Sequence, residues 1–124
     1  MLEVFVVDDS PAIRSSVSLI LKTEGMKPCE AASAEDALAK LKGGAVKPNL
    51  FIVDLNMPGM NGIELIRQIR AMPAFRFVPI LMMTTESQQQ KRTEAKSAGA
   101  TGWLVKPVPP ADLLKVVKQV CPSA

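Results

Sequence analysis

The stretch Phe51-Ile52-Val53-Asp54-Leu55-Asn56-Met57-Pro58-Gly59 indicates how the whole chain folds. Four apolar residues, 50–53, lead without alternation into one carboxylate, and a Pro-Gly turn follows. Such a run is typical of a strand buried on both faces, as in a parallel sheet covered by helices. Asp54 is therefore predicted to lie where a buried strand ends, and this is where ligand crevices open in α/β sheets.

Strand and helix patterns alternate along the rest of the chain. Apolar and β-branched runs predict strands at 2–7, 27–31, 50–53, 78–83 and 102–105. Four helices are predicted to begin where capping residues, glycine or proline precede a helical periodicity, at Ser10-Pro11, Ser33, Gly62 and Pro109-Pro110. One more helix, which comes fourth in chain order, is predicted to begin near Gln88. This alternation predicts an α/β fold with a five-stranded parallel sheet and five helices on its two faces. At 124 residues, the chain is expected to form one domain, 1–124.

Composition argues against several classes of protein. No apolar run is long enough to span a membrane and no signal-peptide pattern is present, so we expect a cytoplasmic protein without membrane insertion. The chain has no histidine, and Cys29 and Cys121 lack metal-ligand spacing, which argues against a zinc site. The net charge of +3 comes without a basic run or aromatic ladder, which argues against direct nucleic-acid binding.

Polar side chains follow four of the five predicted strands. They are Asp8-Asp9, Asp54, Thr84 and Lys106. Each alone is compatible with ordinary turn chemistry, but parallel strands would bring all of them to one edge of the sheet. Crowded carboxylates repel one another unless a cation intervenes, and hard oxygen ligands without imidazole or thiolate favour Mg²⁺, Mn²⁺ or Ca²⁺. A lysine and a hydroxyl suit phosphoryl oxygens, and a carboxylate can be the nucleophile. This combination predicts metal-assisted phosphoryl transfer to an aspartate.

These motifs together resemble a known family. Asp8-Asp9 and the segments 54–62, 83–86 and 102–107 are similar to the receiver domains of two-component response regulators, and closest in character to single-domain chemotaxis regulators of the CheY type. The resemblance covers the whole chain. It implies a flavodoxin-like fold with strand order 2-1-3-4-5.

The resemblance also implies how the acidic residues are used. Asp54 would be the phosphoacceptor. Asp9, Asp54 and the backbone carbonyl of Asn56 would bind Mg²⁺, with Mn²⁺ as an alternative, and Asp8 would act mainly through a coordinated water. The resemblance further implies that the chain catalyses its own phosphorylation and its own aspartyl-phosphate hydrolysis, without being a conventional enzyme.

Further roles follow from the same resemblance. Lys106 would contact the phosphoryl oxygens, with Lys106-Pro107 joined by a cis bond, and Thr84 would move onto those oxygens after phosphorylation. Asn56 and Glu86 occupy the positions that set the rate of dephosphorylation in the family.

Trp103 departs from the family pattern, which has tyrosine or phenylalanine as the switch aromatic at this position. Filling a packed interior with extra volume is unfavourable, and a buried indole N–H needs an acceptor. We therefore expect Trp103 to lean outward beside helix four in the unphosphorylated state, as part of the output surface. The alternative is a partly buried core aromatic.

The implied function is that of a phosphoprotein in signal transduction. A sensor histidine kinase would supply the phosphoryl group, and phosphorylation would alter binding of a downstream protein through helix four, strand five and helix five, in chemotaxis or motility. The protein would be a monomer or a weak phosphorylation-dependent dimer. Three alternatives stay open: a phosphorelay shuttle, a receiver excised from a longer regulator, and an interaction module that is never phosphorylated. The intact acidic set argues against the last.

Overall fold

The computed structural model describes residues 2–85 and 89–122, and its centre is a parallel sheet. The strands are β1 (Glu3–Val7), β2 (Lys27–Ala31), β3 (Leu50–Asp54), β4 (Ile80–Thr84) and β5 (Gly102–Val105). They are hydrogen-bonded in the order β2-β1-β3-β4-β5, which confirms the predicted order.

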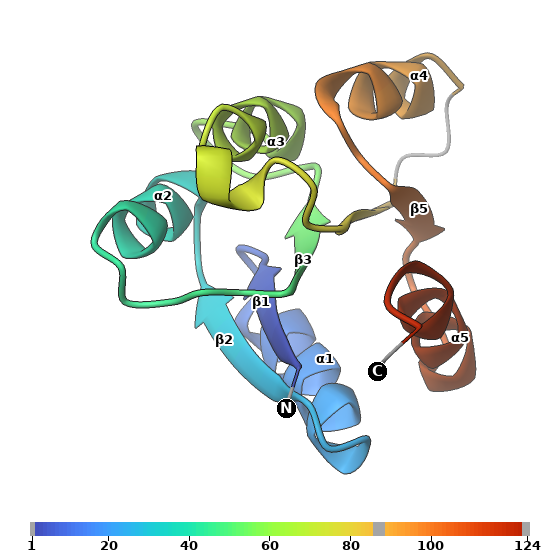
Figure 1. Ribbon diagram of the computed structural model, residues 1–124. Coiled ribbons are helices and arrows are strands. Elements are labelled where there is room, and N and C mark those ends of the chain that lie inside the picture. The colour runs from blue at the N-terminus through green and yellow to red at the C-terminus, as the bar shows by residue number, and fades with distance from the viewer. Residues whose placement is uncertain (1, 86–88, 123–124) are drawn as a thin grey trace.

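Helices cover both faces of this sheet (Figure 1). They are α1 (Pro11–Thr23), α2 (Ala34–Lys42), α3 (Gly62–Arg70), α4 (Gln89–Ala98) and α5 (Pro110–Val120), with a short 3-10 helix η1 (Pro73–Phe75). In Figure 1, α2, α3 and α4 lie above the sheet and α1 and α5 below it. In the described part of the chain, no helix is long and apolar enough to cross a membrane.

Three helices, α1, α2 and α3, begin where a capping side chain accepts a hydrogen bond from one of the first free N–H groups. Ser10, Ser33 and Asn61 each accept a hydrogen bond from the backbone N–H three residues ahead, at 3.4, 3.0 and 3.0 Å. These bonds replace the intrahelical partners that the first turn lacks. Local sequence therefore sets where the chain turns from strand into helix.

The apolar side chains of β3 explain why the run 50–53 does not alternate. Phe51 and Val53 pack into the cluster shared with α2, α3 and α4, whereas Leu50 and Ile52 pack into the cluster shared with α1 and α5. All four are fully buried. Because both faces of the strand are covered, an apolar residue is favoured at every position.

Strand β4 begins at Ile80 and not at Val78 as predicted. Pro79 has no N–H to donate to a ladder, and the carbonyl of Val78 already accepts a hydrogen bond from the Arg70 guanidinium at 2.6 Å. The short helix η1 was not predicted from the sequence. The segment before β4 therefore contacts the end of α3 and does not extend the sheet.

Gly62 places the start of α3 directly against the segment that follows β3. Its N–H donates to the carbonyl of Leu55 at 3.0 Å. A Cβ built at Gly62 would collide with the backbone carbonyl oxygen of Asp54. Any side chain at residue 62 would therefore push α3 away from the end of β3.

We expect Gly62→Ala to lower the free energy of unfolding by about 1–3 kcal/mol, since the clash is with backbone that cannot rotate aside. The measurement is urea denaturation followed by circular dichroism. Gly43→Ala is the control: Gly43 ends α2 with φ −76°, a conformation open to alanine, so its substitution should change stability by less than about 1 kcal/mol. Equal stabilities for the two variants would contradict this account.

Candidate functional site

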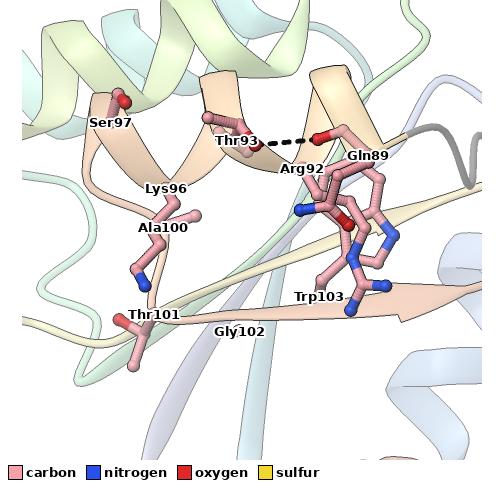
Figure 2. A pocket seen from close by; sticks show the side chains of 10 residues that line it. Gln89, Arg92, Thr93, Lys96, Ser97, Ala100, Thr101, Gly102 and Trp103 are labelled. Carbon is pink, nitrogen blue, oxygen red and sulfur yellow. Dashed lines mark hydrogen bonds between the residues drawn. The ribbon is translucent and has the colours of Figure 1, made fainter.

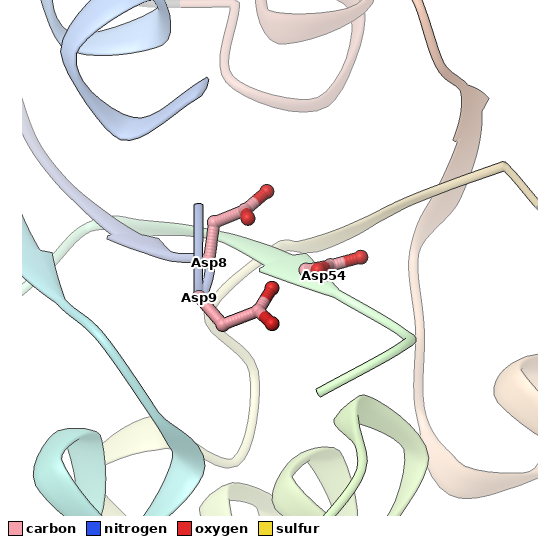
Figure 3. Close-up of side chains that lie close together, drawn as sticks. All are labelled: Asp8, Asp9 and Asp54. Carbon is pink, nitrogen blue, oxygen red and sulfur yellow. The ribbon is translucent and has the colours of Figure 1, made fainter. Parts of the chain in front are cut away.

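Three aspartates meet at the carboxyl edge of the sheet (Figure 3). Asp8 and Asp9 follow β1, Asp54 ends β3, and these two strands are neighbours in the sheet. Each of the three offers a carboxylate oxygen within 4.8 Å of the others. Asp8 and Asp54 are buried and Asp9 is exposed. The cluster is thus buried on the sheet side and open to solvent beside Asp9.

Lys106 brings a cation into this cluster from the end of β5. Its Nζ lies 2.8 Å from Oδ2 of Asp8 and 3.2 Å from Oδ1 of Asp54. The Lys106-Pro107 peptide bond is cis, as the resemblance implied. The backbone N–H of Lys106 donates to the carbonyl of Thr84 at 2.7 Å, which ties the start of this loop to β4.

Thr84 and Asn56 complete the edge of the site. Thr84 is fully buried at the end of β4. The Asn56 side-chain amide donates to Oγ1 of Thr84 at 3.1 Å, and the Asn56 backbone N–H donates to Oδ1 of Asp54 at 3.3 Å. Asn56 thus links the carboxylate to the threonine. Glu86, the other residue assigned to dephosphorylation, lies outside the described residues.

Burial and charge shift the ionisation of the central pair. Burial, followed by repulsion from Asp8, raises the pKa of Asp54 to about 6, although Lys106 and the Asn56 N–H act to lower it. Burial alone would lower the pKa of Lys106, but its hydrogen bond to Asp8 and the charges of Asp54 and Asp8 raise that pKa overall. Lys106 therefore stays protonated, whereas the ionised form of Asp54 is less favourable than that of an exposed aspartate.

The donor set fits a hard divalent cation. Three carboxylates and one ammonium leave two negative charges unbalanced, and all the acidic donors are oxygens. Mg²⁺ prefers one or two carboxylates and keeps waters as its other ligands. Asp8, Asp9 and Asp54 are the residues that could hold such an ion.

Two supporting contacts were missed by the sequence analysis. The backbone N–H of Ser10 donates to Oδ1 of Asp8 at 2.9 Å, and Arg14 donates to the carbonyl of Asp8 at 2.6 Å. The first is an Asx turn, which the spacing of Asp8 and Ser10 could have indicated. The second depends on where α1 packs. Both contacts hold the Asp8 turn in place.

Trp103 was expected to lean outward, but the structure places it against the core. Its ring is partly buried against the core cluster on the face of α2, α3 and α4. Its Nε1 is buried and has no hydrogen-bond partner in the described part of the chain. Ala95 and Ala100 line the same cavity, and their small side chains leave space for the indole beside α4 (Figure 2).

The raised pKa of Asp54 predicts a pH-dependent stability. Because the folded state binds this proton more tightly than the unfolded chain, the contribution of Asp54 to stability is fully present below pH 3.8 and is lost as the pH rises through about 6. Asp54→Asn removes the titrating carboxyl group and, with it, this loss of stability at higher pH. In EDTA above pH 6 the variant should be more stable than the unsubstituted protein by about 1–3 kcal/mol, and the difference should shrink below pH 3.8.

Urea denaturation across this pH range measures the effect. Asp112→Asn, at an exposed residue of α5, is the control and should change the stability by less than about 0.5 kcal/mol. An Asp54→Asn variant less stable than the unsubstituted protein at neutral pH would contradict the assignment.

Comparison with known proteins agrees with this geometry. Residues 4–118 match the response regulator receiver domain family. The chain is 34% identical over 120 residues to chemotaxis protein CheY-3 of Vibrio cholerae, with 96% of this chain and 91% of that protein covered. It is 35% identical over 116 residues to the transcriptional regulatory protein ResD of Bacillus subtilis, covering 94% of this chain and 46% of ResD. Among solved structures, Vibrio cholerae CheY4 superposes with a TM-score of 0.91 at 43% identity, covering 97% of this chain and 98% of that one. The chain belongs to the response regulator receiver family of two-component signalling and is CheY-like.

Proposed function

We propose that this chain is a phosphoryl-accepting switch whose acceptor is Asp54. The observation that carries the proposal is the position of the Lys106 ammonium, 2.8 Å from Asp8 and 3.2 Å from Asp54 at one sheet edge. A cation at this point stabilises the negative charge that a phosphoryl group brings to a carboxylate. The nucleophile, the metal ligands and the cation then all face one small volume.

The phosphoryl group would come from a phosphohistidine of a sensor histidine kinase. An oxygen of Asp54 forms the new bond to phosphorus while the bond from phosphorus to the histidine nitrogen breaks, so the histidine leaves and Asp54 becomes an acyl phosphate. Within the described part of the chain, the contacts of Asp54 with Lys106 and the Asn56 N–H both fall on Oδ1. Oδ2 is thus the oxygen better placed to attack.

Mg²⁺, or Mn²⁺ in its place, would be held by Asp9, Asp54 and the carbonyl of Asn56, with Asp8 acting through a water. When bound, the ion neutralises charge on the phosphoryl oxygens. Lys106 would then pair with an oxygen of the phosphoryl group. The Thr84 hydroxyl, which accepts a hydrogen bond from the Asn56 amide, would donate its proton to a phosphoryl oxygen.

The output would be altered binding of a downstream protein at the surface formed by α4, β5 and α5. Similarity to CheY-3 and CheY4 supports a role in chemotaxis or motility in the cytoplasm. Phosphotransfer onward to a histidine phosphotransfer protein would instead identify the chain as a phosphorelay shuttle.

The central test is labelling of Asp54. Acetyl phosphate or a purified sensor kinase should phosphorylate the protein only when Mg²⁺ is present, and Asp54→Asn should abolish the label, because the amide is a poor nucleophile. Phosphate-affinity electrophoresis measures it. Asp112→Asn, an exposed aspartate on α5, should be labelled like the unsubstituted protein. Full labelling of Asp54→Asn would refute the assignment.

A second test concerns the lifetime of the acyl phosphate. Asn56 presents an exposed amide beside the acceptor, in the position that the family uses to set hydrolysis together with the residue at 86. We expect a lifetime of seconds to a few minutes in Mg²⁺, measured by release of inorganic phosphate. A lifetime of hours would place the chain with slower regulators.

A further inference from the structure

Of the three aspartates at the sheet edge, Asp9 is the one whose carboxylate no neighbouring side chain holds. Asp8 and Asp54 both contact the Lys106 ammonium, at 2.8 and 3.2 Å. The Asp9 side chain is exposed, and it makes no ion pair with the part of the chain that the structure describes. The direction of the Asp9 carboxylate is therefore set by the backbone that carries it.

Arg14 holds the peptide unit that joins Asp8 to Asp9. Its Nη1 donates to the carbonyl oxygen of Asp8 at 2.6 Å. That carbonyl and the N–H of Asp9 belong to one planar unit, so the bond fixes the plane from which the Asp9 side chain departs. Arg14 lies in α1, one turn after the Ser10 cap, and its backbone N–H donates to the Ser10 carbonyl at 3.0 Å. The guanidinium thus reaches back over the turn that contains Asp9.

The Arg14 guanidinium is itself held from its other side. Its Nε lies 3.3 Å from Oε1 of Glu30 on β2, and Oε2 of Glu30 accepts a hydrogen bond from the Ser18 hydroxyl at 3.0 Å. Arg14 and Ser18 are four residues apart, so both lie on the same face of α1. The Arg14 side chain is only 16% exposed, and Ser18 is buried. These contacts give the guanidinium a fixed direction toward the Asp8 carbonyl.

We propose that Arg14 is a positioning residue for the divalent cation. By holding the Asp8 carbonyl it directs the Asp9 carboxylate toward the ion, and Glu30 in turn holds Arg14. The inference rests on the proposed function only in that Asp9 is a ligand of the ion.

The sign of the effect separates this role from two simpler ones. The positive charge of Arg14 repels a divalent cation, so if Arg14 acted only as a nearby charge, its removal would tighten ion binding. If Arg14 only stabilised the fold, its removal would leave the affinity of the folded protein unchanged. A positioning residue predicts the opposite of the first outcome, since its removal leaves Asp9 misdirected and weakens ion binding.

Mn²⁺ binding to the unphosphorylated protein provides the test. Electron paramagnetic resonance measures the free ion and needs no phosphorylation of the protein. Arg14→Gln should weaken Mn²⁺ binding about tenfold, the lower end of the range for contacts that orient metal ligands. Arg14→Lys keeps the charge, but one ammonium does not reproduce the guanidinium fork between Asp8 and Glu30. Its affinity should therefore lie between those of Arg14→Gln and the unsubstituted protein.

Arg70→Gln is the matched control. The Arg70 guanidinium also donates to backbone carbonyls, those of Gly99 and Val78. Arg70 ends α3, however, and the first residue of that helix, Gly62, is the one beside Asp54. Its substitution removes the same charge and should lower stability, measured by urea denaturation in EDTA, but should leave the Mn²⁺ affinity unchanged. Each titration is made under conditions where that variant is folded.

Unchanged or tighter Mn²⁺ binding by Arg14→Gln would overturn the proposal. An equal loss of affinity in Arg70→Gln, or no saturable Mn²⁺ binding by the unsubstituted protein, would do so as well. If Arg14→Gln does not fold, Arg14→Lys decides, and an affinity equal to that of the unsubstituted protein rejects the role.

Labelling with acetyl phosphate in Mg²⁺ separates this inference from the proposed function. Mn²⁺ binding that depends on Arg14, in a protein that is never labelled at Asp54, would retain the positioning role and reject the switch. A protein labelled at Asp54 whose Mn²⁺ affinity does not depend on Arg14 would retain the switch and reject the positioning role.

Discussion

The Lys106 ammonium between Asp8 and Asp54 is the interaction on which the site depends. Repulsion from Asp8 raises the pKa of Asp54, and the charge of Lys106 acts in the opposite direction. A strand separates the lysine from Asp54 in the sheet, because β4 lies between β3 and β5. The contact therefore exists only when four strands are assembled in the observed order. The Lys106 ion pairs therefore form only in the assembled sheet.

The cost of holding Asp54 ionised would also favour the phosphorylation proposed for it. Burial raises its pKa to about 6, so at neutral pH the folded protein retains a carboxylate that would be more stable in water. A divalent cation or a phosphoryl group with its own cation would relieve this cost. The same environment thus disfavours the empty site and favours the occupied one.

Helix α4 is held firmly at its carboxyl end. The Arg70 guanidinium donates to the carbonyl of Gly99, which follows α4, at 2.7 Å from Nη2 and 3.1 Å from Nε, and to the carbonyl of Val78 at 2.6 Å. A cation at the end of a helix stabilises its last carbonyl groups. Gly99 has φ +118°, and a Cβ there would press against Arg70, so glycine is required. The carboxyl end of α4 is thereby anchored to α3 and to the segment before β4.

Much of the fold followed from the sequence alone, because its signals are local. The run 50–53 has no alternation because both faces of β3 are covered, and the caps at Ser10 and Ser33 mark helix starts by hydrogen bonds to their own backbone. The polar residues at the strand ends could be expected at one edge, since parallel strands all point the same way. Their resemblance to receiver motifs supplied the strand order, which short-range patterns do not contain.

Only the tertiary structure decided the features that depend on contacts between distant segments. The hydrogen bond from Asn56 to Thr84, the tether from Arg14 to Asp8 and the carbonyl contacts of Arg70 each join parts of the chain whose distance no local pattern specifies. Trp103 was expected to lean outward because of its size, but small residues on and after α4 leave room for it against the core. Periodicity indicated the buried face of most helices and strands, but not the burial of Trp103. The packing of neighbouring elements decides which buried donors find an acceptor, and it left the indole of Trp103 without one in the described chain.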